Sequence, residues 1–269
     1  MSSTMRNSVI STSLLLLLIW ITVGFRTTNP LSAESQKYMR EILESNEFKS
    51  AELKNNYLKY NFAPLWLSTL NSSVVGIIGD GNRRLQMKLL SAVMDPTHAD
   101  TYLITGKSKV TDNICSFSGT FTIRHVRELR EFNTRVDETV SPAMHEGICL
   151  AEYQLTETNN QPSAGVFTGA LLTRWYVDKK GVLRYDEISS FADGSCNNQF
   201  VGTWTNQKSN KILRCNWGDD RIPNAGKFDI GTGEFSPAYK PGDKEWQRYA
   251  QAWIYDDTAA RKQEQKPWW

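Results

Sequence analysis

The sequence has few of the residues on which catalysis and metal binding most often depend. It contains only three histidines, His98, His125 and His145, and four cysteines. The histidines are scattered and form no HExxH or HxH pattern, and no two cysteines have the CxxC spacing typical of a zinc site. The sequence therefore predicts no metal ion and no cofactor.

An excess of charge of one sign is also lacking. The chain has 31 Lys and Arg residues against 29 Asp and Glu residues, and loss of residues 1–33 would remove Arg6 and Arg26 but no acid. Nucleic-acid binding depends on a clustered basic surface, and no such cluster is present. We therefore expect no nucleic-acid partner.

Long hydrophobic runs are missing except near the N-terminus. The run "LLLLLIWITV" at residues 14–23 follows Arg6 and precedes small residues, which is the layout of a secretory signal peptide. We assign residues 1–33 to it, with cleavage after Gly24 or Ala33. The alternative is an uncleaved membrane anchor, and only then is a membrane partner expected. The sequence thus predicts an exported protein that is periplasmic, secreted or on the cell surface.

Export makes the cysteines informative. An even number of cysteines in an oxidising compartment indicates two disulfides, for which three connectivities exist. Cys196 lies just before one expected strand and Cys215 lies late in the next, so we predict a Cys196–Cys215 bridge. This pairing leaves Cys115–Cys149 as the second bridge.

Residues 34–71 form an N-terminal helical segment in our interpretation. Residues 34–60 are rich in Glu, Lys and Leu, contain no Gly or Pro, and fit one or two amphipathic helices. Pro64 then breaks the pattern. The segment is either a brace packed on the main domain or a partner-binding helix.

From residue 73 onward the hydrophobic period changes to two. The clearest example is "CSFSGTFTIRH", in which Cys115, Phe117 and Phe121 alternate with serines and threonines, as in a sheet with one solvated face. A helix remains an alternative for residues 83–93. The expected strands lie at 74–79, 83–93, 101–110, 115–125, 147–155, 165–177, 182–188, 199–205 and 211–217.

Short turns join nearly all of these strands, and several of their inward positions are glycines. A meander of this kind predicts a mainly β domain over residues 72–218, closed as a calycin-like antiparallel barrel of about eight or nine strands. Residues 127–146 are expected to be an irregular connection. Residues 219–269 are expected to be an irregular extension with a short helix at 244–256 and a loose tail with two tryptophans.

Three stretches carry a resemblance to a known family: "GKSKVTDNICSFSGTF", "GSCNNQFVGTW" and "CNWGDDRIPNAGKFDIGTGEFSP". Over residues 72–240 the chain resembles an uncharacterised family of exported β-rich proteins from Bacteroides-type bacteria, which brings no activity with it. Gly202 and Trp204 also resemble the GxW motif of lipocalins. That motif lies near the first strand in lipocalins and near the last strands here, so the similarity implies an architecture only.

The favoured hypothesis is a non-catalytic binding protein that holds a small apolar or glycan ligand in its barrel. Its candidate ligand-binding residues are the aromatic side chains of Phe121, Tyr153, Trp175, Trp204 and Trp217. The alternative for each ring is that it simply fills the core.

Two other functions remain open. An exported hydrolase of glycan or peptide would need converging catalytic groups, for which His125, Asp186, Glu187 and Asp193 are the candidates. A cell-surface structural or interaction protein would use the helical segment or the terminal tryptophans to bind a partner.

Overall fold

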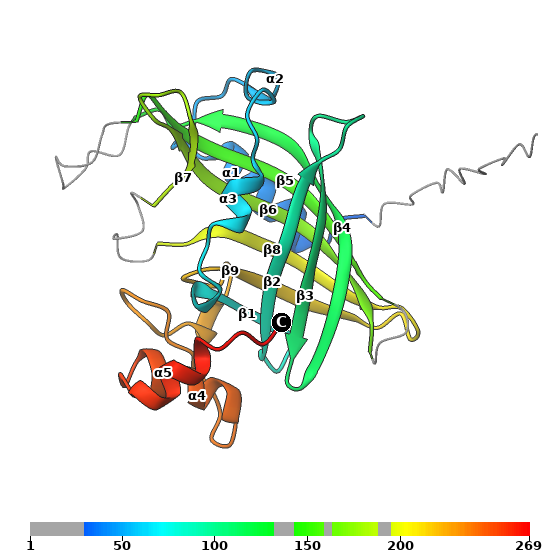
Figure 1. Cartoon of the computed structure of the whole chain (residues 1–269), viewed down its shortest axis with the longest axis vertical. Helices are drawn as coiled ribbons and strands as arrows, with labels where there is room; N and C mark the ends of the chain where they lie inside the picture. Colours follow the sequence, from blue (N-terminus) through cyan, green and yellow to red (C-terminus); the bar gives the residue numbers. More distant parts are fainter. Residues whose placement is uncertain (1–29, 132–142, 159–162, 188–194) are drawn as a thin grey trace, which may run out of the picture.

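The computed structural model describes residues 30–131, 143–158, 163–187 and 195–269, and within them the chain is mainly β (Figure 1). The strands are β1 (Val74–Ile78), β2 (Arg83–Met94), β3 (Thr101–Val110), β4 (Asn113–Glu128), β5 (His145–Glu157), β6 (Gly165–Val177), β7 (Leu183–Tyr185), β8 (Asn197–Asn206) and β9 (Ile212–Asp219). The α-helices are α1 (Ala33–Glu44), α2 (Lys54–Tyr57), α3 (Ala63–Leu67), α4 (Lys244–Trp253) and α5 (Thr258–Glu264).

The strands close into an eight-stranded barrel. Their order is β5-β4-β3-β2-β1-β9-β8-β6, and β5 also pairs with β6, which completes the ring. Every pairing in the ring is antiparallel. The short strand β7 pairs with the last residues of β6, beyond the stretch of β6 that pairs with β8. The closed antiparallel meander predicted from the sequence is confirmed.

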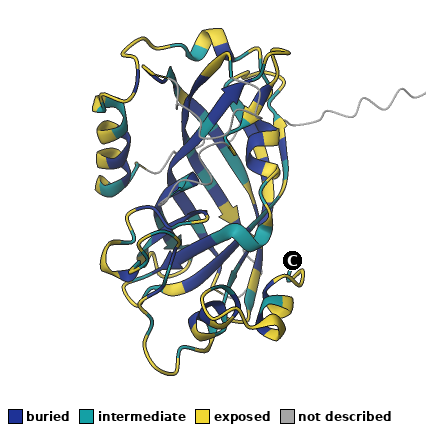
Figure 2. Cartoon of the chain, turned by 90° about the vertical axis from the view of Figure 1, so that its left-hand side faces the viewer, coloured by how far each residue is buried: buried dark blue, intermediate teal, exposed yellow. Residues whose placement is uncertain are grey.

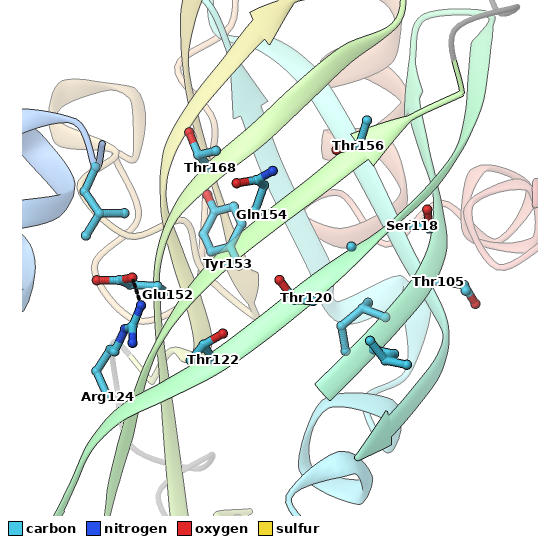
Figure 3. A pocket seen from close by; sticks show the side chains of 14 residues that line it. Thr105, Ser118, Thr120, Thr122, Arg124, Glu152, Tyr153, Gln154, Thr156 and Thr168 are labelled. Atoms are coloured by element: carbon cyan, nitrogen blue, oxygen red, sulfur yellow. Dashed lines mark hydrogen bonds and ion pairs between the residues drawn. The ribbon is translucent and has the colours of Figure 1, made fainter. Parts of the chain in front are cut away.

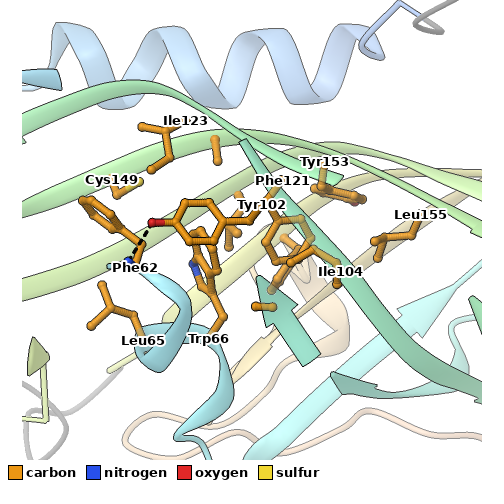
Figure 4. Packing of buried hydrophobic residues seen from close by; sticks show 14 of the residues in the cluster. Phe62, Leu65, Trp66, Tyr102, Ile104, Phe121, Ile123, Cys149, Tyr153 and Leu155 are labelled. Carbon is orange, nitrogen blue, oxygen red and sulfur yellow. Dashed lines mark hydrogen bonds between the residues drawn. The ribbon is translucent and has the colours of Figure 1, made fainter. Parts of the chain in front are cut away.

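Alternation along each strand separates a packed interior from an outer face. On β4, Phe117, Phe121 and Ile123 are buried inside, while Ser118 and Thr120 between them point outward. The interior is filled mainly by aromatic and aliphatic side chains that contact one another across the barrel (Figure 4). The period-two pattern is thus the feature of the sequence that determines which side chains form the core.

Gly169 and Gly202 make room for the ring of Tyr153 against the inner face of the barrel. A Cβ atom at Gly169 or Gly202 would come within 2.6 or 2.3 Å of the Tyr153 hydroxyl oxygen. Tyr153 itself is buried in the core. Gly169 and Gly202 face each other on β6 and β8, so a larger residue at either would displace this ring.

The N-terminal segment is helical only in short pieces. Helix α1 begins after Ser32, whose side chain caps it, and its buried residues pack on the outside of β5, β6 and β8. Of the one or two helices predicted over residues 34–60, α1 and α2 are present, but residues 45–53 between them are not helical. Pro64 does not end a helix; it occupies the first turn of α3, where a missing N–H costs nothing.

The C-terminal segment covers a different part of the barrel wall. Trp246 and Tyr249 of α4 pack against Val75 and Ile77, which point outward from β1. Helix α4 confirms the helix expected at 244–256, while α5 occupies residues expected to be loose (Figure 2 shows buried residues in these helices).

The predicted disulfides are wrong, because all four cysteines are free thiols. Cys215 lies opposite Gly202 on β8, far along that strand from Cys196, whose neighbour Asn197 pairs with Asp219. Because Asp219 is four residues from Cys215 on β9, at about 3.3 Å per residue the two cysteines lie roughly 13 Å apart, whereas a disulfide needs Cα atoms within about 7 Å.

Cys115 and Cys149 are separated in the same way. Cys149 lies opposite Val126 on β4, and Cys115 is near the other end of that strand, roughly 35 Å away. The Cys196–Cys215 prediction assumed that residues near the ends of one hairpin lie close together, and the Cys115–Cys149 pair was the remainder; the register excludes both.

Three other predicted segments lie partly outside the residues that the structure describes. The proposed signal peptide lies mostly in residues 1–29, which are outside them. Of the irregular connection expected at 127–146, β4 extends to Glu128 and β5 begins at His145, and residues 132–142 are outside the described residues. The last residue of the strand expected at 182–188 is also outside them.

Candidate ligand-binding groove

The five predicted ligand-binding rings all lie inside the barrel and are buried. Three of them form one cluster, with ring centroids 6.4 Å apart for Phe121 and Tyr153 and 5.2 Å apart for Tyr153 and Trp217. Trp175 lies apart, against Tyr57 of α2 at 4.5 Å. The rings therefore pack against other side chains, and their role as ligand contacts stays a prediction.

Trp204, the fifth ring, helps to close one end of the barrel. Its Nε1 donates to Glu157 Oε2 at 2.9 Å, and that oxygen also accepts from the Gly165 amide at 2.8 Å. Ser108 donates to the other carboxylate oxygen. Burial raises the pKa of Glu157 above its ordinary value. The buried carboxylate of Glu157 on β5 thus accepts hydrogen bonds from residues of β3, β6 and β8. Trp204, the tryptophan of the GxW sequence, is one of these donors.

The opposite end contains a second buried carboxylate, Asp219. Its Oδ2 accepts from Thr69 at 2.8 Å, Tyr185 at 2.9 Å and Asn198 at 2.8 Å. Burial raises the pKa of Asp219 to about 7 despite these donors. Asn198 also donates to the Leu65 carbonyl oxygen at 3.0 Å, which connects the carboxylate to helix α3.

The groups proposed for hydrolysis do not converge among the described residues. His125 contacts Glu52 at 2.7 Å and His145 contacts Glu128 at 3.1 Å. His98 lies near Asp95, in the turn between β2 and β3. Asp193 lies outside the described residues. Each histidine thus has its own carboxylate partner, and no nucleophile–base arrangement is evident in the described part of the chain.

A groove of about 410 Å³ lies on the outer face of the barrel, over β3, β4 and β5 (Figure 3). Its margin includes Thr168 of β6 and Leu31, just before α1. The hydroxyl groups that line it belong to Thr105, Ser118, Thr120, Thr122, Thr156 and Thr168. Tyr153 also borders it, which makes it the residue common to the groove and the predicted rings.

The strand register arranges these side chains in cross-strand rows. One row contains Leu103, Thr120, Gln154 and Thr168, which are paired in succession on β3, β4, β5 and β6. Adjacent strands are about 4.8 Å apart and outward residues of one strand about 7 Å apart. Neighbouring rows therefore present donors and acceptors at regular intervals.

The rows on either side differ in charge. On one side Thr105, Ser118 and Thr156 are paired across three strands and carry only hydroxyl groups. On the other side Arg124 Nη2 donates to Glu152 Oε2 at 2.6 Å, and both side chains are partly exposed. Because the two charges offset each other, the lining side chains carry no net charge.

Sequence reasoning missed this groove because its residues resemble an ordinary solvated sheet face. The clue was present in "CSFSGTFT", where each outward position carries a hydroxyl group. An outward face usually mixes hydroxyls with Lys and Glu, so a run of uncharged hydroxyl groups was informative. Their meeting with Gln154 of β5 depends on the register, which the sequence did not specify.

Comparison with known proteins returned no matching family model, no matching curated protein and no matching solved structure. The fold class therefore rests on the barrel itself, whose closed antiparallel architecture is consistent with a calycin-like barrel. Within the described ranges, no helix has the length and apolar character to span a bilayer. The same residues contain no group of three His, Cys, Asp or Glu side chains suited to hold a metal ion.

Proposed function

We propose that this chain is an exported, non-catalytic binding protein that holds a neutral glycan in the groove on the outer face of its barrel. The observation that carries the proposal is the set of polar side chains in the groove, which are hydroxyl groups, one amide and one internally neutralised ion pair, beside the apolar Leu31, Leu103 and Ile104. The groove volume of about 410 Å³ also falls in the range of small-molecule sites.

The chemistry of the lining favours a neutral glycan over other ligands. Sugar hydroxyls both donate and accept hydrogen bonds, and the hydroxyl groups of Thr120 and Thr156 and the amide of Gln154 do the same. An anionic ligand would need a cation without a partner, and Arg124 already pairs with Glu152 at 2.6 Å. A purely apolar ligand would leave these polar groups without partners, which is costly.

Export and family are parts of the proposal that rest on the sequence. The apolar run before residue 24 supports a signal peptide, and the three family-like stretches support a place among exported β-rich proteins of Bacteroides-type bacteria. A free glycan outside the cytoplasm is a ligand that such a protein would meet.

The experiment is a binding screen of the full mature chain against immobilised neutral, sulfated and sialylated oligosaccharides, followed by calorimetry. The double variant Thr120→Val/Gln154→Met removes polar groups from the central row while keeping side-chain size. We expect it to weaken binding of a neutral glycan about 10- to 100-fold, since each hydrogen bond contributes about 0.5–1.5 kcal/mol.

Thr205→Val is the matched control, because Thr205 points outward from β8, a strand that contributes no residue to the groove lining. It should bind like the wild type. Binding restricted to charged glycans would contradict the proposal. So would a loss of affinity in Trp217→Phe, inside the barrel, with none in the groove variant, because the ligand would then lie in the interior.

A further inference from the structure

Three aliphatic side chains are exposed on the outer face of β2 and β3, two of them paired and the third separated from that pair by the hydrogen-bonded Ser91 and Thr105. Their exposed fractions are 48% for Leu90, 60% for Val93 and 40% for Leu103. Val93 and Leu103 are directly paired, and Leu90 lies at the irregularity in register between Leu89 and Ser91. A bulge of this kind can redirect a side chain, and here it leaves Leu90 at the surface. We call Leu90, Val93 and Leu103 the aliphatic strip.

The aliphatic strip is continuous with the groove. Leu103 belongs to both, since it lines the groove and pairs with Val93 on one side and with Thr120 on the other. The row that contains Gln154 and Thr168 thus continues into apolar side chains toward β2. A ligand that fills the groove would reach the strip without crossing another element.

The described parts of the chain that cover the rest of the barrel wall leave this strip open. Helix α1 packs over β5, β6 and β8, and the C-terminal segment packs over β1. The terminal Trp269 reaches β2 only as far as Lys88, whose Nζ lies 4.9 Å from its ring centroid. The strip is therefore an uncovered apolar surface at the end of a polar groove.

We propose that the ligand is a glycolipid, an amphiphile whose neutral sugar head lies in the groove and whose alkyl chain lies along the aliphatic strip. This inference rests on the proposed glycan function and adds the apolar part of the ligand. The polar groups of the groove, which carry no net charge, match the head, and the exposed aliphatic side chains that adjoin it on β2 and β3 match a chain attached to that head. A sugar alone would leave the strip exposed to water.

The experiment measures the affinity of the full mature chain for maltose and for methyl, hexyl and octyl maltoside, by calorimetry below the micelle concentration. In the wild type we expect affinity to rise about two- to fourfold per added methylene over part of the series, because each buried methylene adds to binding. The variant Val93→Thr/Leu103→Thr keeps strand-forming residues but makes the strip polar, and it should abolish the dependence on chain length.

Ile212→Thr is the matched control, because Ile212 is 64% exposed on β9 and belongs to neither the groove nor the strip. It should keep the wild-type dependence on chain length. If the strip variant also keeps it, the alkyl chain binds elsewhere and the glycolipid proposal is overturned. A flat series in the wild type overturns it as well.

The same affinity measurements distinguish failure of the glycan proposal from failure of the glycolipid proposal. If the glycan proposal fails, Thr120→Val/Gln154→Met would leave the affinity for every maltoside unchanged. A second copy of this chain is the other possible occupant of the strip. Sedimentation of the wild type as a dimer, with conversion to monomer by Val93→Thr/Leu103→Thr, would overturn the glycolipid proposal in favour of that interface.

Discussion

Asp219 is the single residue whose ionisation we expect to have the largest effect on stability. Its pKa is about 7 in the folded protein, because burial disfavours the charged form, and about 3.9 in an unfolded chain. Between these values the folded state binds more protons than the unfolded state. Stability is therefore highest below about pH 4 for this group and decreases as the pH rises toward 7.

Asp219→Asn tests this expectation, because the amide cannot ionise while its oxygen still accepts from Thr69 or Tyr185. We expect the decrease in unfolding free energy from pH 4 to pH 7 to become smaller, by about 4 kcal/mol at most. Urea unfolding at several pH values measures it. In the variant, the unfolding free energy should still decrease somewhat with rising pH because of Glu157, whose pKa is also raised. An unchanged slope in the variant would contradict the assignment.

At the scale of the element, α3 is a short helix that contributes a large part of one end of the core. Trp66 contacts Tyr102 at 4.8 Å and Phe121 at 5.1 Å between ring centroids, both edge to face (Figure 4). Its Nε1 donates to Thr173 Oγ1 at 3.0 Å. Apart from Asn61 Oδ1, which accepts from the Ala63 amide at 3.1 Å, the start of this five-residue helix has little support from its own sequence, so its stability comes mainly from this packing.

Trp66→Ala should therefore destabilise the protein by about 3–5 kcal/mol, because it removes a buried ring and leaves a cavity. Trp66→Phe should cost less, since it keeps a ring and loses mainly the hydrogen bond. Urea unfolding measures both. Leu70→Ala, at a position 74% exposed, is the control and should change stability by less than about 0.5 kcal/mol. A Trp66→Ala protein as stable as this control would show that α3 is not part of the core.

The strands were predictable because alternation requires no knowledge of partners. The pattern around Phe117 and Phe121 specifies which face is buried whatever lies beside it. Contacts between strands were not predictable in the same way. The proposed Cys196–Cys215 bridge failed because the register pairs Cys215 with Gly202.

The groove was unpredictable for the same physical reason. Thr120 was correctly placed on the solvated face, but its neighbours Leu103 and Gln154 come from other strands. Local pattern gives the direction of a side chain, and only the register gives its neighbours. The short helices α2 and α3 lie inside the helical segment predicted at 34–71, but their bounds were not predictable, because tertiary packing and not periodicity holds them.

At the scale of the whole molecule, the barrel wall is divided between two coverings and one open face. Helix α1 covers β5, β6 and β8, and the C-terminal segment covers β1 (Figure 1). The groove lies over β3, β4 and β5. The coverings bury outward apolar residues such as Ile77 and Leu150, which the barrel alone would expose. Polar outward residues under the coverings have partners there, as Asn216 does with Glu34 and Gln199 with Tyr38.

A buried ion pair joins the C-terminal segment to the barrel. Arg84 of β2 donates to Glu264 of α5 at 3.0 Å through Nη1, and both side chains are almost fully buried. The Arg84 guanidinium also lies over the rings of Trp246 and Tyr249, at 5.6 and 5.1 Å. Loss of Arg84 would leave the buried Glu264 paired only with Arg248, whose Nε donates to it at 2.6 Å, so the cost should be below the roughly 3–5 kcal/mol typical of an uncompensated buried charge.

Arg84→Met should therefore release α4 and α5 from the barrel while the barrel itself stays folded. Limited proteolysis with mass analysis should show cleavage between about residue 240 and the C-terminus at far lower protease concentration than in the wild type. Arg84→Met/Glu264→Leu removes both buried charges and leaves Arg248, which is 35% exposed, to be solvated, so it should restore much of the resistance. Lys37→Met removes only an exposed pair with Glu41 and should behave like the wild type. If Arg84→Met instead unfolds the whole chain in one step, the C-terminal segment and the barrel form one cooperative unit, because loss of a contact between them then destabilises both.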